Sequence, residues 1–205
     1  MNEPDGDAAQ WETEGPSGST PLESDELEGL IPSWVATRSD LNEAEQQNIL
    51  HALDQRRWRR ATTEHLLDDL AARELHKDMF GQVWKWAGRY RLTERNIGVE
   101  PRMVAVCVRD LMEDAKSWIE SGTTTSDEAA CRFHHRLVQV HPFPNGNGRH
   151  ARAMTDLLLR SLGAPAFTWG RAGPDGAGAV RAAYIAALRA ADSGDFEALA
   201  TFLHS

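Results

Sequence analysis

Apolar residues recur at helical spacing along most of the chain. In the segment 127–140, Ala130, Phe133, Leu137 and Val140 lie three or four positions apart, so they share one face of a helix. Similar stripes, bounded by turn residues, occur over most of the remaining sequence. This pattern predicts an all-α fold with helices near residues 20–29, 40–59, 64–80, 101–120, 127–140, 147–162, 176–192 and 195–204.

One tract does not follow the helical pattern. Residues 90–93 contain Tyr, Leu and Thr, and residues 97–99 contain Ile and Val, which suit two short strands around a Glu-Arg-Asn turn. From these residues alone, an ordinary connecting loop is the simpler interpretation. The local pattern therefore leaves a loop and a β-hairpin both open.

Charge divides the chain into two parts. Residues 1–30 contain nine Asp or Glu and no Lys or Arg, whereas the whole chain has 31 acidic and 22 basic residues. Subtracting nine from 31 leaves 22 acidic residues against 22 basic ones over residues 31–205, so that part is neutral. The acidic, Gly- and Pro-rich composition of residues 1–19 predicts a disordered tail. An acidic chain without a basic patch argues against direct nucleic-acid binding.

Length and composition predict one globular domain over residues 31–205. The chain has 205 residues, of which 41% are hydrophobic, enough to bury a core. The first 30 residues lack a basic start and an apolar centre, and no run is apolar enough to cross a membrane, so we expect a cytoplasmic protein without a membrane partner. Cys107 and Cys131 fall within predicted helices and are expected to be reduced core residues.

The segment from His141 to Arg152 reads His-Pro-Phe-Pro-Asn-Gly-Asn-Gly-Arg-His-Ala-Arg and lies just before a predicted helix. Its glycines let the backbone approach a ligand, and the N-terminus of the helix favours anions. Arg149 and Arg152 are three positions apart on the first turn, where planar guanidinium groups bind phosphate oxygens. A neutral imidazole at His141 is suited to take a proton from a hydroxyl that attacks such a phosphate.

The same segment resembles the Fic family signature, His-x-Phe-x-Asp/Glu-Gly-Asn-Gly-Arg-x-x-Arg, with one departure at Asn145. The resemblance implies a Fic-type helical core. It also implies a protein adenylyltransferase, which moves AMP from ATP to a Ser, Thr or Tyr hydroxyl of a target protein, with His141 as the base. The residues that it assigns to nucleotide and phosphate binding are Asn145, Gly146, Asn147, Gly148, Arg149 and Arg152.

The departure from the signature at Asn145 affects the expected binding of Mg²⁺. In the family, the acidic residue at this position usually helps to hold Mg²⁺, a hard cation that prefers carboxylate ligands. The amide oxygen of Asn145 is a weaker ligand. We therefore expect ATP as substrate and Mg²⁺ as cofactor, with a weaker metal dependence or a slower turnover.

A second motif lies near the N-terminus. The sequence from Ser24 to Gly29, Ser-Asp-Glu-Leu-Glu-Gly, resembles the Ser/Thr-x-x-x-Glu-Gly/Asn motif of the inhibitory helix of self-restrained Fic proteins. The resemblance implies that Glu28 pairs with Arg152 and blocks the productive placement of the ATP γ-phosphate. Residues 20–30 would then form an inhibitory helix. The alternative is an acidic helix whose Glu28 is merely solvated.

The resemblance also bears on the tract before residue 100. Fic proteins carry a hairpin, the flap, which aligns a segment of the target protein as an added strand. This favours a small β-hairpin flap here. The residues expected to contact the target are Thr93, Asn96, Ile97 and Gly98.

Other functions remain open. His134, His135, His141 and His150 suggest a metal hydrolase, but adjacent histidines diverge on a helix and no zinc-like spacing is present. Asn145 allows a non-enzymatic regulator that binds nucleotide. Within the family, transfer of another phosphate-containing group and removal of AMP are further alternatives. Relatives are often encoded beside a small DNA-binding protein, so such a genetic partner is an additional expectation.

Overall fold

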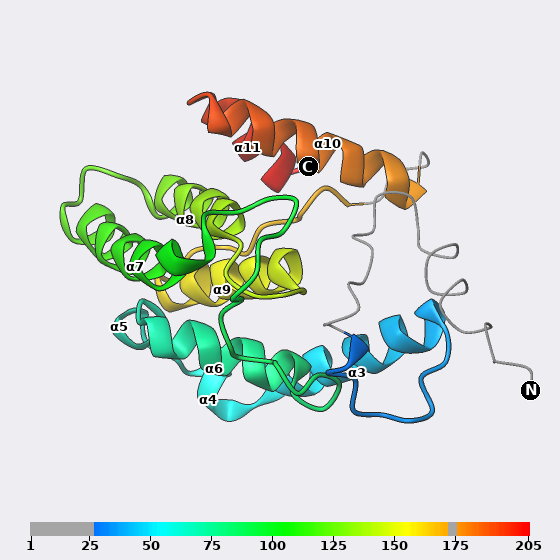
Figure 1. Ribbon diagram of the computed structural model, residues 1–205. Coiled ribbons are helices and arrows are strands. Elements are labelled where there is room, and N and C mark those ends of the chain that lie inside the picture. Colours follow the sequence, from blue (N-terminus) through cyan, green and yellow to red (C-terminus); the bar gives the residue numbers. More distant parts are fainter. Residues whose placement is uncertain (1–26, 172–175) are drawn as a thin grey trace, which may run out of the picture.

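The computed structural model describes residues 27–171 and 176–205, and these residues form an all-α fold (Figure 1). The all-α prediction is confirmed. The helices are α3 (Arg38–Asp54), α4 (Arg56–Arg59), α5 (Thr63–Leu66), α6 (Asp69–Phe80), the short 3₁₀ turn η1 (Pro101–Met103), α7 (Val104–Glu120), α8 (Ser126–Val140), α9 (Asn147–Ser161), α10 (Gly176–Asp192) and α11 (Phe196–Leu203).

Helices α8 and α9 pack side by side at the centre of the molecule (Figure 1). Helix α7 flanks α8, and α6 packs on α9 with α3 beyond it. Helices α10 and α11 pack against each other, and α11 contacts α8. The connection between α8 and α9 is therefore at the middle of the fold, where elements from both halves of the chain can reach it.

Two predicted helices are interrupted. The segment 40–59 breaks at Gln55 into α3 and α4, and the segment 64–80 breaks before Asp68 into α5 and α6. Both breaks have polar caps or extended backbone: Gln55 has φ −59° and ψ 134°, and the Asp68 carboxylate accepts the Leu70 N–H at 2.7 Å. Apolar periodicity continues across such caps, which is why the sequence pattern alone did not reveal them.

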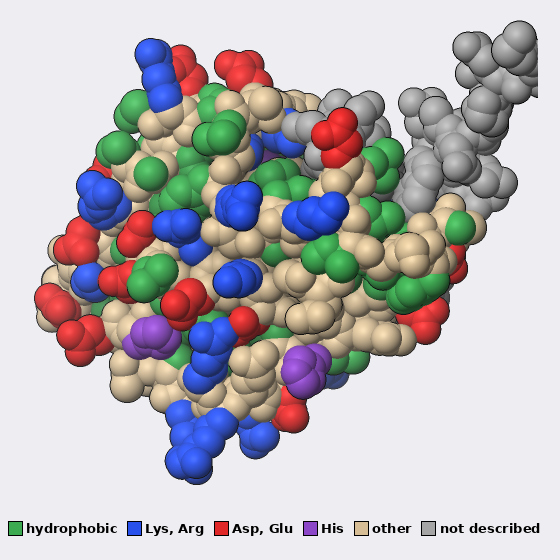
Figure 2. Space-filling view, turned by 60° about the horizontal axis from the view of Figure 1, so that its bottom comes forward, with side chains coloured by type: hydrophobic (Ala, Val, Ile, Leu, Met, Phe, Trp, Pro, Cys, Tyr) green, Lys and Arg blue, Asp and Glu red, His purple; other side chains and the backbone are tan. Residues whose placement is uncertain are grey.

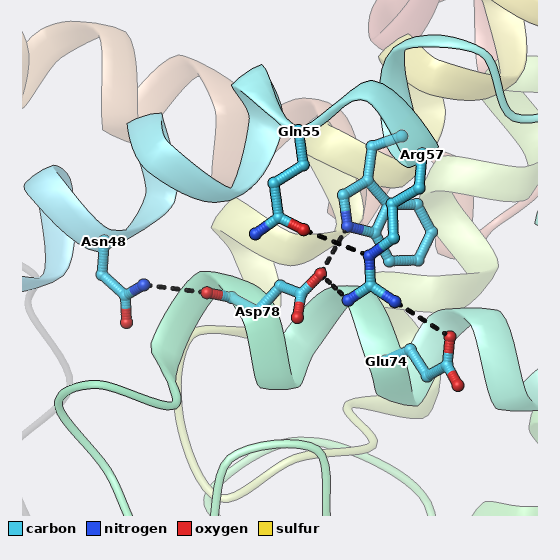
Figure 3. Close-up of polar contacts among 6 residues, drawn as sticks. Asn48, Gln55, Arg57, Glu74 and Asp78 are labelled. Atoms are coloured by element: carbon cyan, nitrogen blue, oxygen red, sulfur yellow. Dashed lines mark hydrogen bonds and ion pairs between the residues drawn. The ribbon is translucent and has the colours of Figure 1, made fainter.

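A polar cluster attaches α4 to α6 (Figure 3). The Asp78 carboxylate accepts a hydrogen bond from the Trp58 indole N–H at 2.6 Å and forms an ion pair with Arg57. Arg57 also contacts Glu74 at 3.4 Å, and the Asn48 amide donates to the Asp78 carbonyl at 2.8 Å. These contacts fix the position of α6, whose last residues lie beneath the α8–α9 connection.

Two groups of buried apolar residues stabilise the fold. The larger lies among α3 to α9 and contains the fully buried rings of Trp58, Phe80, Trp84 and Phe133. The second joins α10 and α11 to α8 and α9 and includes Tyr184. Large aromatic side chains contribute much of the apolar area that stabilises such cores. The site described below lies where the two groups meet, because α8 and α9 contribute to both.

Charged side chains of both signs are interspersed on the surface. The face in Figure 2 carries both Lys or Arg and Asp or Glu side chains, in keeping with the balanced charge of residues 31–205. Within residues 27–171 and 176–205, no helix combines the length and apolar character needed to cross a membrane. Cys107 is half-buried and Cys131 is buried, and both are free thiols.

The predicted tail (1–19) and most of the predicted inhibitory segment (20–30) lie outside the described residues, as does Ser24. Leu27 is helical, and a turn follows at Glu28 and Gly29. The chain then joins the loop after α6: the Lys85 N–H donates to the Gly29 carbonyl at 2.8 Å, and Leu30 forms an isolated β-bridge with Trp84. These contacts anchor the end of the N-terminal segment on the domain.

Candidate active site

The loop between α8 and α9 is formed by residues 141–146. Helix α8 ends at His141, which adopts a left-handed conformation with φ 52° and ψ 61°. Gly146, with φ 76°, is the N-cap of α9. The backbone N–H groups of Asn147, Gly148 and Arg149 precede the first intrahelical bond of α9, so they form its anion-attracting end. The predicted helix, loop and helix arrangement is confirmed.

Asn147 has a structural function in this loop. Its Oδ1 accepts the Phe143 N–H at 2.8 Å, and its Nδ2 donates to the Phe143 carbonyl at 2.8 Å. The residue is only 3% exposed. Its side chain is thus committed to the loop, and only its backbone N–H is placed to bind an anion.

The two motif glycines have different surroundings. A Cβ at Gly146 would lie 2.6 Å from the Phe80 ring, and its positive φ also disfavours any other residue. A Cβ at Gly148 would meet no atom within 4 Å. Gly146 is therefore needed for packing, whereas Gly148 keeps the open side of the helix N-terminus clear for a ligand.

His76 supports the loop from below. Its Nδ1 accepts the Gly88 N–H at 3.0 Å, so the proton resides on Nε2, which donates to the Asn145 carbonyl at 3.1 Å. The ring stacks on Phe143 with centroids 3.7 Å apart. Burial, together with the neighbouring His150, holds the pKa of His76 well below its usual value, so the ring is neutral.

His141 is also neutral at physiological pH. Burial lowers its pKa to about 4, and the positive charges of Arg91 and Arg95 act in the same direction. The Val138 carbonyl acts in the opposite direction and raises the pKa of His141. The buried Nδ1 atom of the ring has no hydrogen bond of good geometry. The imidazole is therefore an unprotonated base at pH 7.

Arg149, predicted to bind phosphate, is paired with a carboxylate in the structure. Its Nη1 lies 2.8 Å from Glu45 Oε2, and Glu45 is nearly buried on α3. The other Glu45 oxygen accepts the Trp84 indole N–H at 2.7 Å. The Arg149 guanidinium also lies over the Phe80 ring, 5.1 Å from its centroid. To bind phosphate, the Arg149 guanidinium would have to bind Glu45 and the phosphate at the same time, or break its ion pair with Glu45.

Arg152, one turn along α9 from Arg149, lies among aromatic side chains. Its guanidinium carbon is 4.8 Å from the Tyr184 ring centroid and 5.5 Å from that of Trp169. Its Nε is buried and has no hydrogen-bond partner. Trp169 in turn donates to the Asp156 carboxylate at 3.0 Å. The two motif arginines thus share a helix turn but have separate partners.

Asn145 offers little to a metal ion. Its Oδ1 accepts the Gly146 N–H at 2.7 Å, and an amide carries no charge. No three His, Cys, Asp or Glu side chains of the described chain come together as a metal site. His134 instead bonds to Tyr184 at 2.8 Å, and His150 bonds to the Ala72 carbonyl at 2.8 Å. This donor set does not fit Mg²⁺ held by the protein, nor does it support the metal-hydrolase alternative.

The predicted β-hairpin is wrong. Across the part of the chain that the structure describes there is no strand, and residues 91–99 form an irregular loop beside His141. The Thr93 carbonyl is bound by an arginine side chain, and Gly98 has φ 115° and lies so close that a Cβ there would be 2.8 Å from His141 Cβ. Asn96 is exposed, and Ile97 is 52% exposed. All four predicted flap residues nevertheless lie within this loop, which contacts His141 through Gly98.

The ion pair between Glu28 and Arg152 is not formed. Glu28 is exposed, and the ion pairs among the described residues do not include one between these two side chains. The guanidinium of Arg152 packs on Tyr184 and Trp169 instead.

Three residues near the site were not predicted: Glu45, His76 and Arg91. Each is buried and polar, and each contacts the motif from a distant part of the sequence. In the sequence, a polar residue at a position where the helical pattern expects an apolar one can indicate a buried polar contact. The sequence does not show which residue such a side chain contacts.

Comparison with known proteins agrees with this geometry. Residues 66–159 match the model of the Fic/DOC family. Protein adenylyltransferase fic-1 of Caenorhabditis elegans is 32% identical over 133 residues, which cover 63% of this chain and 24% of that protein. The chain thus spans about a quarter of the length of the curated relatives that it matches first.

Solved structures share the fold. A structure of Fic-1 from C. elegans matches with a TM-score of 0.63 and 25% identity, covering 85% of this chain and 50% of that chain. BepC of Bartonella tribocorum, crystallised with AMPPNP, matches with a TM-score of 0.66 and 15% identity, covering 89% and 97% of the two chains. Together with the motif and the loop geometry, these matches show that residues 66–159 resemble the Fic/DOC family domain and that the chain shares its fold.

Proposed function

We propose that this protein is a protein adenylyltransferase that moves AMP from ATP to a Ser, Thr or Tyr hydroxyl of a target protein. The observation that carries the proposal is the placement of a neutral, largely buried His141 directly before the N-terminus of α9. A base and an anion-binding helix end are what attack on a phosphate requires. The adenylyltransferase names of relatives that are 30–32% identical support the choice of reaction.

In the proposed reaction, Nε2 of His141 takes the proton of the target hydroxyl. The hydroxyl oxygen then bonds to the α-phosphorus of ATP, the bond between that phosphorus and the bridging oxygen to the β-phosphate breaks, and pyrophosphate leaves. The N–H groups at the start of α9 stabilise the negative charge on the phosphate oxygens. The product is an AMP phosphodiester on the target side chain.

The two arginines have different functions in this proposal. Arg152, which packs on Tyr184 and Trp169 and whose buried Nε has no hydrogen-bond partner, would bind the leaving phosphates through its guanidinium. Arg149 is paired with Glu45, which competes with phosphate for its guanidinium. Because the protein offers no carboxylate beside Asn145, Mg²⁺ would be held by the nucleotide phosphates.

The N-terminal segment is proposed to restrain the reaction. Gly29 and Leu30 are fixed to the loop after α6, which contains Trp84, the hydrogen-bond partner of Glu45. Glu28 is therefore attached to the domain near the arginine-rich site. Its movement onto Arg152 would place a carboxylate where a phosphate binds, and its removal is expected to raise the transfer rate.

The test is label transfer from ATP that is radioactive at the α-phosphate or, separately, at the γ-phosphate. Wild type, Glu28→Gly, and Glu28→Gly with His141→Ala are incubated with cell lysate, with Mg²⁺ or with EDTA. We expect α-label on protein in Glu28→Gly, and a loss of about 10²- to 10⁴-fold when His141 is replaced.

The other outcomes separate the alternatives. Label from the γ-phosphate would mean a kinase. ATP binding without label in any variant would indicate a non-enzymatic nucleotide-binding regulator, and loss of α-label from a modified target would indicate removal of AMP. Equal α-label in wild type and Glu28→Gly would still support the transferase reaction but would exclude its inhibition by Glu28. A His141→Ala variant with full activity would contradict the proposed mechanism.

A further inference from the structure

Arg91 is a buried arginine whose side chain binds only backbone carbonyl groups. It is 2% exposed, and the ion pairs of the described chain do not include it. Its Nε donates to the His141 carbonyl at 2.6 Å, and Nη1 donates to the Thr93 carbonyl at 3.1 Å. Nη2 donates to the Val140 carbonyl at 3.4 Å and also to the Val99 carbonyl. One guanidinium thus joins the end of α8 to both ends of the loop 91–99.

These contacts stabilise an otherwise unfavourable backbone. The carbonyls of Val140 and His141 lie at the C-terminus of α8, where helix carbonyls lack partners and where a positive charge is favoured. His141 has a left-handed conformation, which is disfavoured for a residue with a Cβ. The Arg91 N–H adds a hydrogen bond to the Pro142 carbonyl at 2.9 Å. The side chain and main chain of Arg91 therefore brace His141 from both sides.

We propose that Arg91 is the positioning residue of His141: its guanidinium holds the left-handed turn that aims the imidazole and links that turn to the loop 91–99. The contact at Gly98, which lies against both the Arg91 guanidinium and His141 Cβ, completes the link. The base and the loop that borders it therefore keep one fixed arrangement. The catalytic part of this inference rests on the proposed function of His141, whereas the geometric part does not.

Electrostatics gives the inference a separate readout. Arg91 and Arg95 are the charged groups that face His141, and both lower its pKa. Removal of the charge at position 91 should therefore raise the pKa of His141. Lysine would keep the charge but lacks the planar fork that binds several carbonyls at once. Charge and geometry can thus be separated by two substitutions.

The experiment compares Arg91→Gln and Arg91→Lys in a Glu28→Gly background. The pKa of His141 is measured by NMR titration of ¹³C-labelled histidine, with the signal assigned by its loss in His141→Ala. Adenylyl transfer is measured with α-labelled ATP. We expect transfer to fall about 10²-fold in both variants, because a small misplacement of a reacting group has that effect. We expect the pKa of His141 to rise in Arg91→Gln and to stay near the parent value in Arg91→Lys.

Arg73→Gln is the matched control. Arg73 also donates to a backbone carbonyl, that of Gly88 at 3.2 Å, and packs on Tyr90, but it is exposed and does not contact His141. Its replacement is expected to change transfer by no more than about twofold, as for other surface substitutions. A similar loss in Arg73→Gln and Arg91→Gln would overturn the specific function of Arg91.

The remaining outcomes also support or overturn the proposal for Arg91. A folded Arg91→Gln variant with the parent rate and the parent pKa of His141 would overturn the proposal. If Arg91→Gln does not unfold cooperatively, Arg91→Lys decides, and a folded lysine variant with full transfer would overturn the proposal. If no variant transfers label, the proposed function has failed. In that case the pKa of His141 in Arg91→Gln still tests the contact: a raised pKa agrees with the Arg91 charge lying beside His141, and an unchanged pKa overturns that placement.

Discussion

Residues 141–147 and residues 91–99 meet at His141 but are stabilised by different contacts. The first segment is fixed by the Asn147 amide, by His76 and by the close approach of Gly146 to Phe80. The second segment is fixed mainly through Arg91, and two of its apolar side chains face solvent, with Leu92 90% and Ile97 52% exposed. The first loop is therefore held by buried contacts from several residues, whereas most of the hydrogen bonds that hold the second come from Arg91.

This difference suggests a division of function. A phosphate-binding loop must present N–H groups in one geometry, so it benefits from several independent contacts. A surface that meets a target protein benefits from exposed apolar side chains and a backbone that is not already paired in a sheet. The predictions below test whether stability depends on the first loop and target modification on the second.

Acidification should have the largest effect, because neutral histidines lie in the first loop and against it: His141 is part of the loop, His76 binds the Asn145 carbonyl, and the His150 ring packs on Phe143. Burial lowers the pKa of His141 and His150 to about 4, that of His134 to about 3, and that of His76 well below its usual value. Folded pKa values below the unfolded 6.5 mean that stability is complete above pH 6.5 and falls as the pH drops. Each group contributes roughly 1.4 kcal/mol per pH unit in that window. Asp156, whose pKa burial raises to about 6, opposes the trend with one group.

The measurement is urea unfolding between pH 7 and pH 5. His150→Asn should flatten the decline, because it removes one group that must stay neutral in the folded protein. His51→Asn, at an exposed position, is the matched control. A free energy of unfolding that stays constant from pH 7 to pH 5 would contradict the assignment of these rings as buried and neutral.

Gly146→Ala should destabilise the first loop strongly. The new Cβ would lie 2.6 Å from Phe80, which is fully buried, and the residue would keep a positive φ. Overpacking and backbone strain together cost about 2 to 5 kcal/mol. Gly148→Ala, two residues away with open space around it, should leave the free energy of unfolding unchanged or raise it slightly. Equal thermal stability of the two variants would refute the packing function of Gly146.

Asn147→Ala should have a somewhat smaller effect. It leaves the N–H and the carbonyl of Phe143 without partners in a buried setting, at a cost of about 2 to 4 kcal/mol. Asn147→Asp keeps the acceptor and should lose less. Asn96→Ala, in the exposed second loop, is the control and should change stability by less than about 0.5 kcal/mol. Chemical denaturation of the three variants measures these differences in the free energy of unfolding. If Asn147→Ala is as stable as the parent protein, the Asn147 side chain does not stabilise the loop.

Leu92→Ser and Ile97→Ser should have the smallest effect on stability, below about 0.5 kcal/mol, because both side chains are largely exposed. Under the proposed function they should reduce label transfer to the target and leave ATP binding intact. Leu70→Ser, an exposed leucine on α6, is the control for a general loss of surface apolarity. If transfer falls as much in Leu70→Ser, the second loop has no special function in target contact.

The sequence by itself determined the features that depend on near neighbours. Apolar periodicity identified the helices, and the contiguous motif from His141 to Arg152 located the loop, the candidate base and the N-terminus of α9. Such features follow from spacing along one segment, because residues three or four apart share a helix face and a loop must link adjacent helices. The resemblance to the Fic family added the reaction, which spacing alone does not supply.

Only the tertiary structure decided what the site residues touch. The pairing of Arg149 with Glu45 joins positions 104 apart in sequence, and that of Arg91 with His141 joins positions 50 apart. Arg91 also explains why no hairpin forms, since its guanidinium binds carbonyls at both ends of the loop. Buried polar groups must find partners, but packing chooses those partners from many that are compatible with the sequence. The orientation of the base and the accessibility of each arginine are therefore properties of the assembled fold.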